Sequence, residues 1–393
     1  MTLNTTLATR TSTAPPEAVL HSTAPSHHRF HLLDALRGIA AFLVVLFHMP
    51  PFLCNFGQQS AYLAVDFFFC LSGFVIAFSY EKRLLASMSL KDFFAARAIR
   101  LYPTYLLATL LGFCVFITSL HHPLTTLLKG QLLALTVCQV GMLPNLHIWP
   151  GPFLFPMDEP AWSLFYEFLA NLAFAALLRK KLASSWTMIL SALLGSALLS
   201  VWAFKGHRLD VGWSNDWHHI TMGIARVTLS FSTGVLMLRL FHRTGRPLLT
   251  PILQRVIPIT LAIALIFLLT APIRTLQTSG FQVFTILVLF PAVVYLGSLI
   301  TTPASWTKLC VFLGNISYPV YLLQGVLFAL LYKQGVTDFA KRHPHAVLAS
   351  FLALLTALSH LTFKLYDAPV RSRLTHWYNT RIRTPKAIAL LNS

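Results

Sequence analysis

Ten long apolar segments follow one another along most of this chain, and they restrict its possible folds more than any other feature. Each is close to the roughly 20 residues that a helix needs to cross the hydrocarbon core of a bilayer. Only 11% of the residues are charged, whereas soluble domains usually contain about a quarter. The sequence therefore excludes a soluble globule and predicts an all-α polytopic membrane protein. The ten predicted transmembrane helices lie near residues 33–52, 61–80, 101–120, 162–178, 186–204, 220–240, 253–270, 281–299, 309–332 and 346–366.

An eleventh apolar stretch, at residues 127–143, is shorter and is interrupted by Lys129, Gly130 and Gly141. Counting it as a span would invert the orientation of every later helix. Cytoplasmic loops of membrane proteins carry an excess of Lys and Arg. Ten spans with the N-terminus inside collect most of the 30 basic residues on the cytoplasmic side, whereas eleven spans divide them nearly evenly. We therefore expect ten spans, a re-entrant or interfacial segment at 127–143, and both termini in the cytoplasm.

The regions outside the spans are small. Residues 1–30 are rich in Thr, Ser, Ala and Pro, which predicts a disordered cytoplasmic tail rather than a signal peptide. We expect one membrane domain at 31–369 and a basic cytoplasmic tail at 370–393. This topology and attraction to membrane lipids explain the formal net charge of +18, so the charge does not predict nucleic-acid binding. The five cysteines have no CxxC or Cys/His spacing, which predicts neither a metal site nor a disulfide framework.

Arg37 and His48 stand eleven positions apart inside the first apolar segment. A central Arg costs about 2.5–3.5 kcal/mol on insertion scales, so residues of this kind usually have a function. Eleven residues of α-helix rotate through about three full turns and rise about 16 Å, which places both side chains on one face. An imidazole near a helix end can take a proton from a hydroxyl near neutral pH, or it can be an ordinary interfacial residue.

Asp66, Glu167 and Arg226 are further charged residues in predicted spans. A carboxylate at this depth should be protonated or paired with a cation, and Arg226 is a candidate counter-ion for either one. Asp66 could be catalytic, or it could only pair with a buried base. Ser72, in the same helix as Asp66, stands beside Gly73, and small residues let neighbouring helices approach closely.

Arg97 and Arg100 lie three positions apart in the segment KDFFAARAIRLYP, between the second and third predicted spans. This spacing places them on one face of a short helix that we expect to end before Pro103. The rigid donors of a guanidinium group match phosphate oxygens, which would suit a phosphorylated ligand on the cytoplasmic side. Ordinary positive-inside charge is the alternative explanation.

Five sequence elements together resemble acyltransferase family 3, integral membrane acyltransferases that O-acetylate bacterial polysaccharides and related acceptors. The segment LDALRGIAAFLVVLFH is similar to the family's signature of an arginine, ten residues and a histidine. The other elements occur in the family's order, and they are VDFFFCLSGFVIA, RAIRLYP, WSLFYEF and LGNISYPVYLLQ. The resemblance runs from about residue 32 to residue 369, and the combination is specific although each element alone is short.

The resemblance implies transfer of an acyl group, commonly acetyl from acetyl-CoA, to a hydroxyl of a carbohydrate such as an exopolysaccharide, an O-antigen or its lipid-linked precursor. It implies a multi-pass protein of the bacterial inner membrane without a bound cofactor, whose partners are acyl-CoA, a carbohydrate or glycolipid acceptor and membrane lipids. His48 matches the catalytic histidine and Arg37 its partner arginine, and Arg97 and Arg100 match a pair associated with the acyl donor. Supporting or substrate-binding roles are expected for Asp66, Ser72, Trp162, Ser163, Glu167, Arg226 and Tyr318.

Two positions depart from the usual family pattern. Gln324 stands where many members have a histidine, and Asp367 stands where a glutamate before proline is usual, so we do not expect proton transfer at these positions. The sequence leaves open a non-polysaccharide acceptor, such as a lipid or small glycoside, and another acyl group such as succinyl. A membrane transporter is the alternative of another class, and it predicts internal repeats, which we do not find in the sequence.

Overall fold

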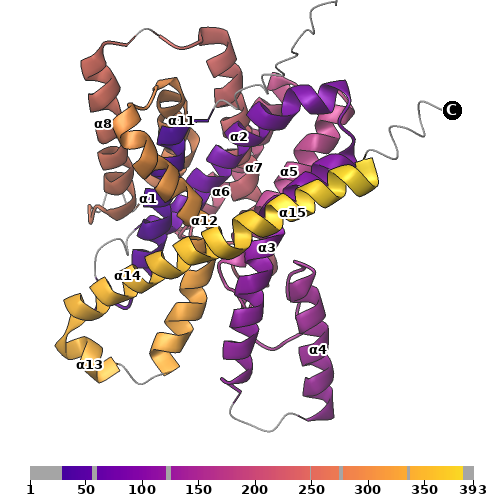
Figure 1. Cartoon of the computed structure of the whole chain (residues 1–393), viewed down its shortest axis with the longest axis vertical. Coiled ribbons are helices and arrows are strands. Elements are labelled where there is room, and N and C mark those ends of the chain that lie inside the picture. Colours follow the sequence, from indigo (N-terminus) through magenta and orange to yellow (C-terminus); the bar gives the residue numbers. More distant parts are fainter. Residues whose placement is uncertain are drawn as a thin grey trace, which may run out of the picture.

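Ten helices of the computed structural model are long and apolar enough to cross a membrane, within the part of the chain that the structure describes (Figure 1). That part comprises residues 29–54, 60–120, 125–247, 249–273, 278–333 and 337–383. Its regular structure is helical, with one isolated β-bridge between Phe153 and Ser214. The predicted all-α architecture is therefore confirmed, and the number of helices that could cross a membrane agrees with the ten predicted spans.

The helices follow the order of the predicted segments. The long ones are α1 (His31–His48), α2 (Ala64–Ala86), α3 (Leu90–Ile117), α5 (Ala161–Arg179), α6 (Ser185–Phe204), α7 (Trp217–Thr244), α8 (Pro251–Thr270), the continuous unit of α10 (Ser279–Phe284), η2 (Thr285–Leu289) and α11 (Phe290–Leu299), α12 (Ala304–Lys333) and α14 (Pro344–Leu361). Shorter helices are η1 (Ala61–Leu63), which leads into α2, α4 (Thr126–Val140) and α13 (Thr337–Arg342). α4 has 15 residues and is too short to count among the ten. A re-entrant α4 and cytoplasmic termini stay predictions.

The expectation of a short helix that ends before Pro103 is wrong. Ser89 caps α3 by accepting a hydrogen bond from the backbone N–H of Asp92 at 3.1 Å, and the helix then runs for 28 residues with Pro103 inside it. Proline removes one backbone hydrogen bond, but its fixed φ is compatible with a helix. Both halves of α3 are packed against neighbours, as the burial of Arg97 and Tyr105 shows, so the helix continues.

The last membrane helix extends beyond its predicted end at residue 366. α14 continues through the π-helical segment η3 (Thr362–Asp367) into α15 (Ala368–Tyr378) and η4 (Asn379–Arg383). Figure 1 shows this unit as one long helix in yellow. No residue of α15 is buried. The apolar pattern identifies only the membrane-embedded part of such a helix, so it gave no sign of the polar continuation.

Two helix pairs form the centre of the bundle, because α1 packs along α12 and α2 packs along α7. Glycines bring the second pair into backbone contact. A Cβ atom at Gly73 would overlap the carbonyl oxygen of Phe231, and one at Gly234 would overlap that of Cys70. The close approach expected from a small residue at position 73 is therefore present.

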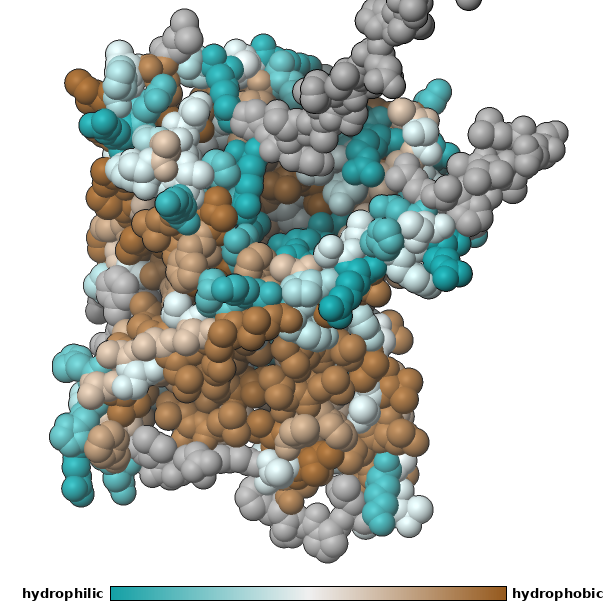
Figure 2. All heavy atoms as spheres, viewed as in Figure 1, coloured by the Kyte–Doolittle hydropathy of each residue, from teal (hydrophilic) through white to brown (hydrophobic). Residues whose placement is uncertain are grey.

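The outer surface is largely apolar, as a bilayer requires. Hydrophobic residues dominate the lower half of the face in Figure 2, and hydrophilic residues gather around a hollow in its upper half. Leu133, Leu190 and Ile263 are each more than 60% exposed. We name the end of the bundle near Arg37 the arginine side and the end near His48 the histidine side.

Candidate active site

A cavity of about 570 Å³, which we name the arginine cavity, lies between α1, α2, α3, α5 and α12. Carboxylates of Asp34 and Glu167 contribute to its wall. The α2 side of the cavity is mainly apolar and is formed by Val65, Phe68, Phe69, Leu71, Val75 and Ile76. Five arginines line the cavity, and they are Arg29, Arg37, Arg97, Arg100 and Arg371. Basic groups therefore outnumber acidic groups in this wall.

Arg37 reaches from α1 to α12. Its Nε donates to Ser317 Oγ at 3.0 Å, and its Nη2 donates to the carbonyl oxygen of Gly314 at 2.9 Å and to Asp34 Oδ1 at 3.1 Å. His48, at the other end of α1, lies beside Phe328 of the same helix α12, with 6.4 Å between the ring centroids. Both side chains thus lie on the face of α1 that packs on α12, as their spacing predicts.

Arg97 pairs with Glu167 across the arginine cavity. Arg97 Nη2 lies 3.3 Å from Glu167 Oε1, and Ser72 Oγ donates to the same oxygen at 2.8 Å. The counter-ion of Glu167 is therefore Arg97 and not Arg226. The buried Nε of Arg97 has no hydrogen-bond partner among the described residues, so this arginine retains a free donor.

Arg100 rests on an aromatic face. Its Cζ lies 5.8 Å from the ring centroid of Tyr318, whose hydroxyl donates to the carbonyl oxygen of Leu101 at 2.7 Å. This hydrogen bond fixes the ring, and the ring attracts the cation through its π face. Arg100 makes no hydrogen bond or ion pair to another described residue, which leaves its donors available to a ligand.

Arg29 and Arg371 also line the arginine cavity, although neither was a predicted site residue. Arg29 Nε lies 2.7 Å from Asp34 Oδ2, and Arg371 Nη2 lies 2.7 Å from Asp367 Oδ2. Asp367 also accepts a hydrogen bond from Thr104 Oγ1 at 2.8 Å, which anchors Arg371 to α3. In the sequence both arginines look like ordinary positive-inside charge, so no local signal distinguished them.

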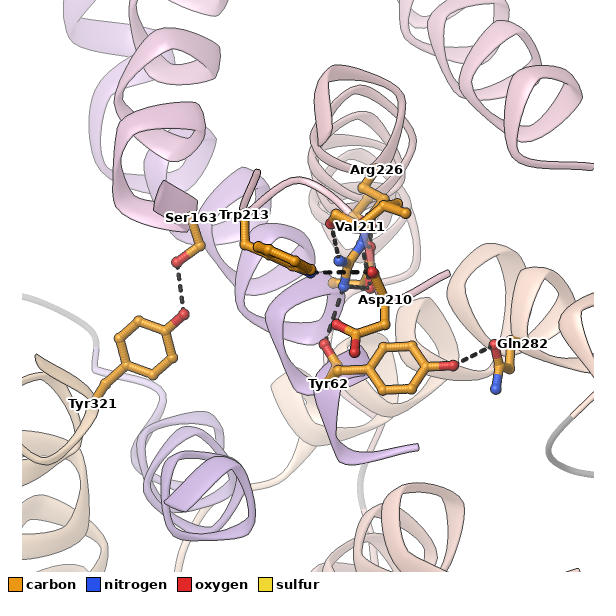
Figure 3. Close-up of polar contacts among 10 residues, drawn as sticks. Tyr62, Ser163, Asp210, Val211, Trp213, Arg226, Gln282 and Tyr321 are labelled. Carbon is orange, nitrogen blue, oxygen red and sulfur yellow. Dashed lines mark hydrogen bonds and ion pairs between the residues drawn. The ribbon is translucent and has the colours of Figure 1, made fainter. Parts of the chain in front are cut away.

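Ser163 and Tyr321 meet at the wall of the arginine cavity (Figure 3). Their hydroxyl oxygens are 2.8 Å apart, and either one can donate. The Tyr321 ring also packs edge-on against Phe68, with 5.6 Å between centroids. This contact joins α5 to α12 and is part of the cavity wall. Tyr321 was not among the predicted site residues, although it lies three positions after Tyr318 in the same motif.

His48 lies outside the arginine cavity, on the histidine side, and its partner is Glu159. His48 Nδ1 is 2.9 Å from the carbonyl oxygen of Val44, and His48 Nε2 is 3.7 Å from Glu159 Oε2. The two side chains are 30% and 35% exposed. Burial raises the pKa of the Glu159 carboxyl, and the nearby His48 lowers it by less. We name these two residues the His48–Glu159 pair.

Glu159, Ser163 and Glu167 stand at intervals of four residues. Backbone turns at Asp158 and Pro160 continue the helical course just before α5 begins. Four residues correspond to about one turn and about 6 Å, so the three side chains lie on one face. Glu167 and Ser163 line the arginine cavity, and the His48–Glu159 pair lies about one turn beyond it. Glu159 was not a predicted site residue, although this four-residue spacing is visible in the sequence.

Asp66 is the counter-ion of Arg226. The closest contact is 2.6 Å, and both side chains are fully buried. Arg226 also donates to the carbonyl oxygens of Val211 at 2.7 Å and Tyr62 at 3.0 Å (Figure 3). Its Cζ lies 5.5 Å from the ring centroid of Trp162. Asp66, Trp162 and Arg226 do not line the arginine cavity. They connect α2, α5 and α7 and so support the site from outside.

The profile of a family described as an acyltransferase domain matches residues 30–362. The chain belongs to acyltransferase family 3. A relative, "Protein 2 in picA locus" of Rhizobium radiobacter, is 38% identical over 160 residues, which cover 37% of this chain and 81% of that protein. No solved structure matches the chain significantly. Family membership and the ten apolar helices identify a multi-pass membrane acyltransferase rather than a transporter.

Proposed function

We propose that this acyltransferase moves an acyl group, in the simplest case acetyl, from acyl-CoA to a hydroxyl group of a carbohydrate. One observation carries the proposal. The arginine cavity and the His48–Glu159 pair follow one another along one face of α5 and of the turns that lead into it. A phosphorylated donor can be held at the first position, and an acceptor hydroxyl can be activated at the second.

The charge of the arginine cavity supports acyl-CoA as the donor. CoA carries phosphate groups, and guanidinium groups bind phosphate oxygens through several donors at once. Arg97 and Arg371 each keep a carboxylate partner, whereas Arg100 has none among the described residues. The excess of positive charge therefore suits a polyanion. The apolar wall of α2 suits the pantetheine arm, and the volume of about 570 Å³ is typical of ligand sites.

The orientation of His48 supports a hydroxyl as the acceptor group. Because a carbonyl oxygen only accepts, Nδ1 carries the proton in the neutral ring and Nε2 carries the lone pair. Nε2 can take the proton of a hydroxyl while the oxygen attacks the thioester carbon. The O–H and C–S bonds break, a C–O bond forms, and His48 passes the proton to the CoA thiolate or to water. An acyl-histidine relay would use the same nitrogen.

We place the arginine side in the cytoplasm and the histidine side at the opposite face of a bacterial inner membrane. The positive-inside rule supports this orientation, and CoA thioesters are cytoplasmic whereas surface glycans are exported. The acyl group must then pass the contact between Ser163 and Tyr321, which lies between the arginine cavity and the His48–Glu159 pair.

The experiment that tests the function compares the acyl content of cell-surface and secreted glycans by NMR. Cells would express the wild-type protein, His48→Ala, or the control His218→Ala, which alters an exposed histidine near the same side of the bundle. We expect His48→Ala to lose acylation while the protein remains inserted, and His218→Ala to retain it. Full acylation in the His48→Ala strain would refute the proposal.

A further inference from the structure

We propose that the His48–Glu159 pair binds its acceptor through two hydroxyl groups on adjacent carbon atoms, one donating to His48 Nε2 and the other to the Glu159 carboxylate. The inference rests on the proposed transfer to a hydroxyl group. It narrows the acceptor to a vicinal diol, as sugar rings present, and it excludes acceptors with a single isolated alcohol.

Contacts to Val44 and Phe47 fix the direction of the His48 lone pair. Nδ1 lies 2.9 Å from the carbonyl oxygen of Val44, one turn earlier in α1, so this nitrogen carries the proton of the neutral ring. The ring packs edge-on against Phe47, with 5.2 Å between centroids. These contacts hold the imidazole with Nε2 turned toward Glu159.

The facing atoms of His48 and Glu159 are too far apart for a normal hydrogen bond. Nε2 and Glu159 Oε2 are 3.7 Å apart, which is longer than a normal hydrogen bond. A neutral Nε2 and an ionised carboxylate are both acceptors, so neither satisfies the other. Two hydroxyl groups held side by side would donate to both atoms at normal distances. A single hydroxyl has one proton and would leave one acceptor unsatisfied.

Proton transfer from the acceptor hydroxyl creates a positive charge on the His48 imidazole. The first hydroxyl gives its proton to Nε2 while its oxygen forms the new ester bond to the acyl carbon. The C–S bond of the thioester breaks, CoA leaves as the thiolate, and the second hydroxyl keeps its proton. The resulting imidazolium lies beside the Glu159 carboxylate, which stabilises it by charge attraction. The same carboxylate thus orients the diol before the reaction and compensates the charge during it. Both side chains are about one third exposed, so a ligand can reach them.

The test measures protection of His48 from diethyl pyrocarbonate, which modifies unprotonated imidazole, by mass spectrometry of peptides from purified protein. The probes are cis-1,2-cyclohexanediol, 1,4-cyclohexanediol and cyclohexanol. We expect only the 1,2-diol to slow the modification of His48. In the Glu159→Gln variant, the concentration of 1,2-diol that halves the rate of His48 modification should be about tenfold higher than in the wild type, because one hydrogen bond to a charged group is lost. Glu81→Gln, a carboxylate paired with Arg239 elsewhere, should behave as the wild type.

No acyl donor is present in this experiment, so its result is independent of whether transfer to a hydroxyl occurs. Equal protection by the three probes, or undiminished protection of Glu159→Gln by the 1,2-diol, would overturn the inference. Modification of the exposed His218 in the same samples corrects for differences in reagent activity, and the size-exclusion profile of each variant reports whether it is folded. If Glu159→Gln is misfolded, Glu159→Asp takes its place, because it keeps the charge, shortens the reach and should also weaken protection.

Discussion

The arginines inside this bundle differ in whether an anionic side chain neutralises their charge. Arg226 is fully buried, and Asp66 together with two carbonyl oxygens satisfies its donors. Arg100 has an aromatic face and no anionic partner among the described residues. The first arrangement suits a structural role, because all three guanidinium nitrogens already donate hydrogen bonds. The second suits a ligand-binding role, because the charge is still available.

The first prediction concerns the stability of the Arg226–Asp66 pair. Arg226→Met should destabilise the folded protein by about 3–5 kcal/mol, because it leaves the buried Asp66 carboxylate without its counter-ion. The thermal midpoint of the detergent-purified protein, measured by size-exclusion chromatography after heating, reports the loss. Lys341→Met is the control, because the Lys341–Asp338 pair is exposed and should contribute about 0–1 kcal/mol. Similar midpoints for the two variants would contradict the structural role of Arg226.

The second prediction concerns the pH dependence of acyl transfer. Burial raises the pKa of the Glu159 carboxyl. The titratable groups that interact electrostatically with this carboxyl are His48, Asp210 and Asp158. Its carboxylate form is therefore lost at a higher pH than in an ordinary glutamate. Activity that needs this carboxylate should be full above that pKa and should fall as the pH is lowered through it. The residual activity of Glu159→Gln, followed from about pH 8 to about pH 5, should lack this part of the decline. An identical profile in both proteins would assign the decline to other groups.

Polar side chains connect neighbouring helices, and the contact between α5 and α12 is one example. Ser163 and Tyr321 connect these helices at the wall of the arginine cavity, one turn from the His48–Glu159 pair. The contact therefore lies between the proposed donor site and the proposed acceptor site.

The third prediction concerns that separation. Tyr321→Phe keeps the ring that packs on Phe68 but removes the hydroxyl that bonds to Ser163. We expect water to reach the bound thioester more easily, so that acyl-CoA hydrolysis without acceptor rises several-fold relative to transfer. Release of free CoA thiol, measured with and without acceptor membranes, gives both rates. An unchanged ratio would show that this hydrogen bond does not separate the two sites.

The fourth prediction concerns the contribution of α15. Arg371 lines the arginine cavity and is anchored by Asp367, whereas Arg373 is exposed on the same helix. Arg371→Gln should raise the KM for acyl-CoA about tenfold with little change in kcat, because a charge-assisted hydrogen bond to the donor is lost. Arg373→Gln should leave both constants unchanged. Equal effects of the two substitutions would mean that the helix acts through its general charge.

The whole molecule combines an apolar exterior with a strongly basic interior cavity. The five arginines of that cavity come from the segment before α1 and from α1, α3 and α15. Their joint field should attract a polyanion, and salt weakens such a field when the charges are partly accessible to solvent.

The fifth prediction follows from this field. The KM for acetyl-CoA should rise several-fold between about 50 mM and about 300 mM salt, because ions screen the arginines. S-acetylpantetheine, which lacks phosphate groups, should show a KM that hardly depends on salt. Steady-state kinetics with both donors measures the difference. Equal salt dependence for the two donors would argue against phosphate recognition in the arginine cavity.

The sequence alone determined the parts of this protein that depend on local spacing. A bilayer requires long apolar helices, so the ten spans are visible as ten apolar segments. Helical periodicity is equally local, and it placed Arg37 and His48 on one face of α1. It also placed Arg97 and Arg100 on one face of a helix. We expected that helix to end before Pro103, but it continues through this residue.

Only the tertiary structure decided which distant side chains meet. Asp66 and Glu167 were equal candidates for the counter-ion of Arg226. The packing of α2 on α7 brings Asp66 into contact with Arg226. Arg371 joined the arginine cavity because the C-terminal helix continues past its apolar part, and Glu159 joined His48 because α5 begins beside the end of α1. Such pairings depend on the positions of whole helices relative to one another, and no spacing within a single helix specifies those positions.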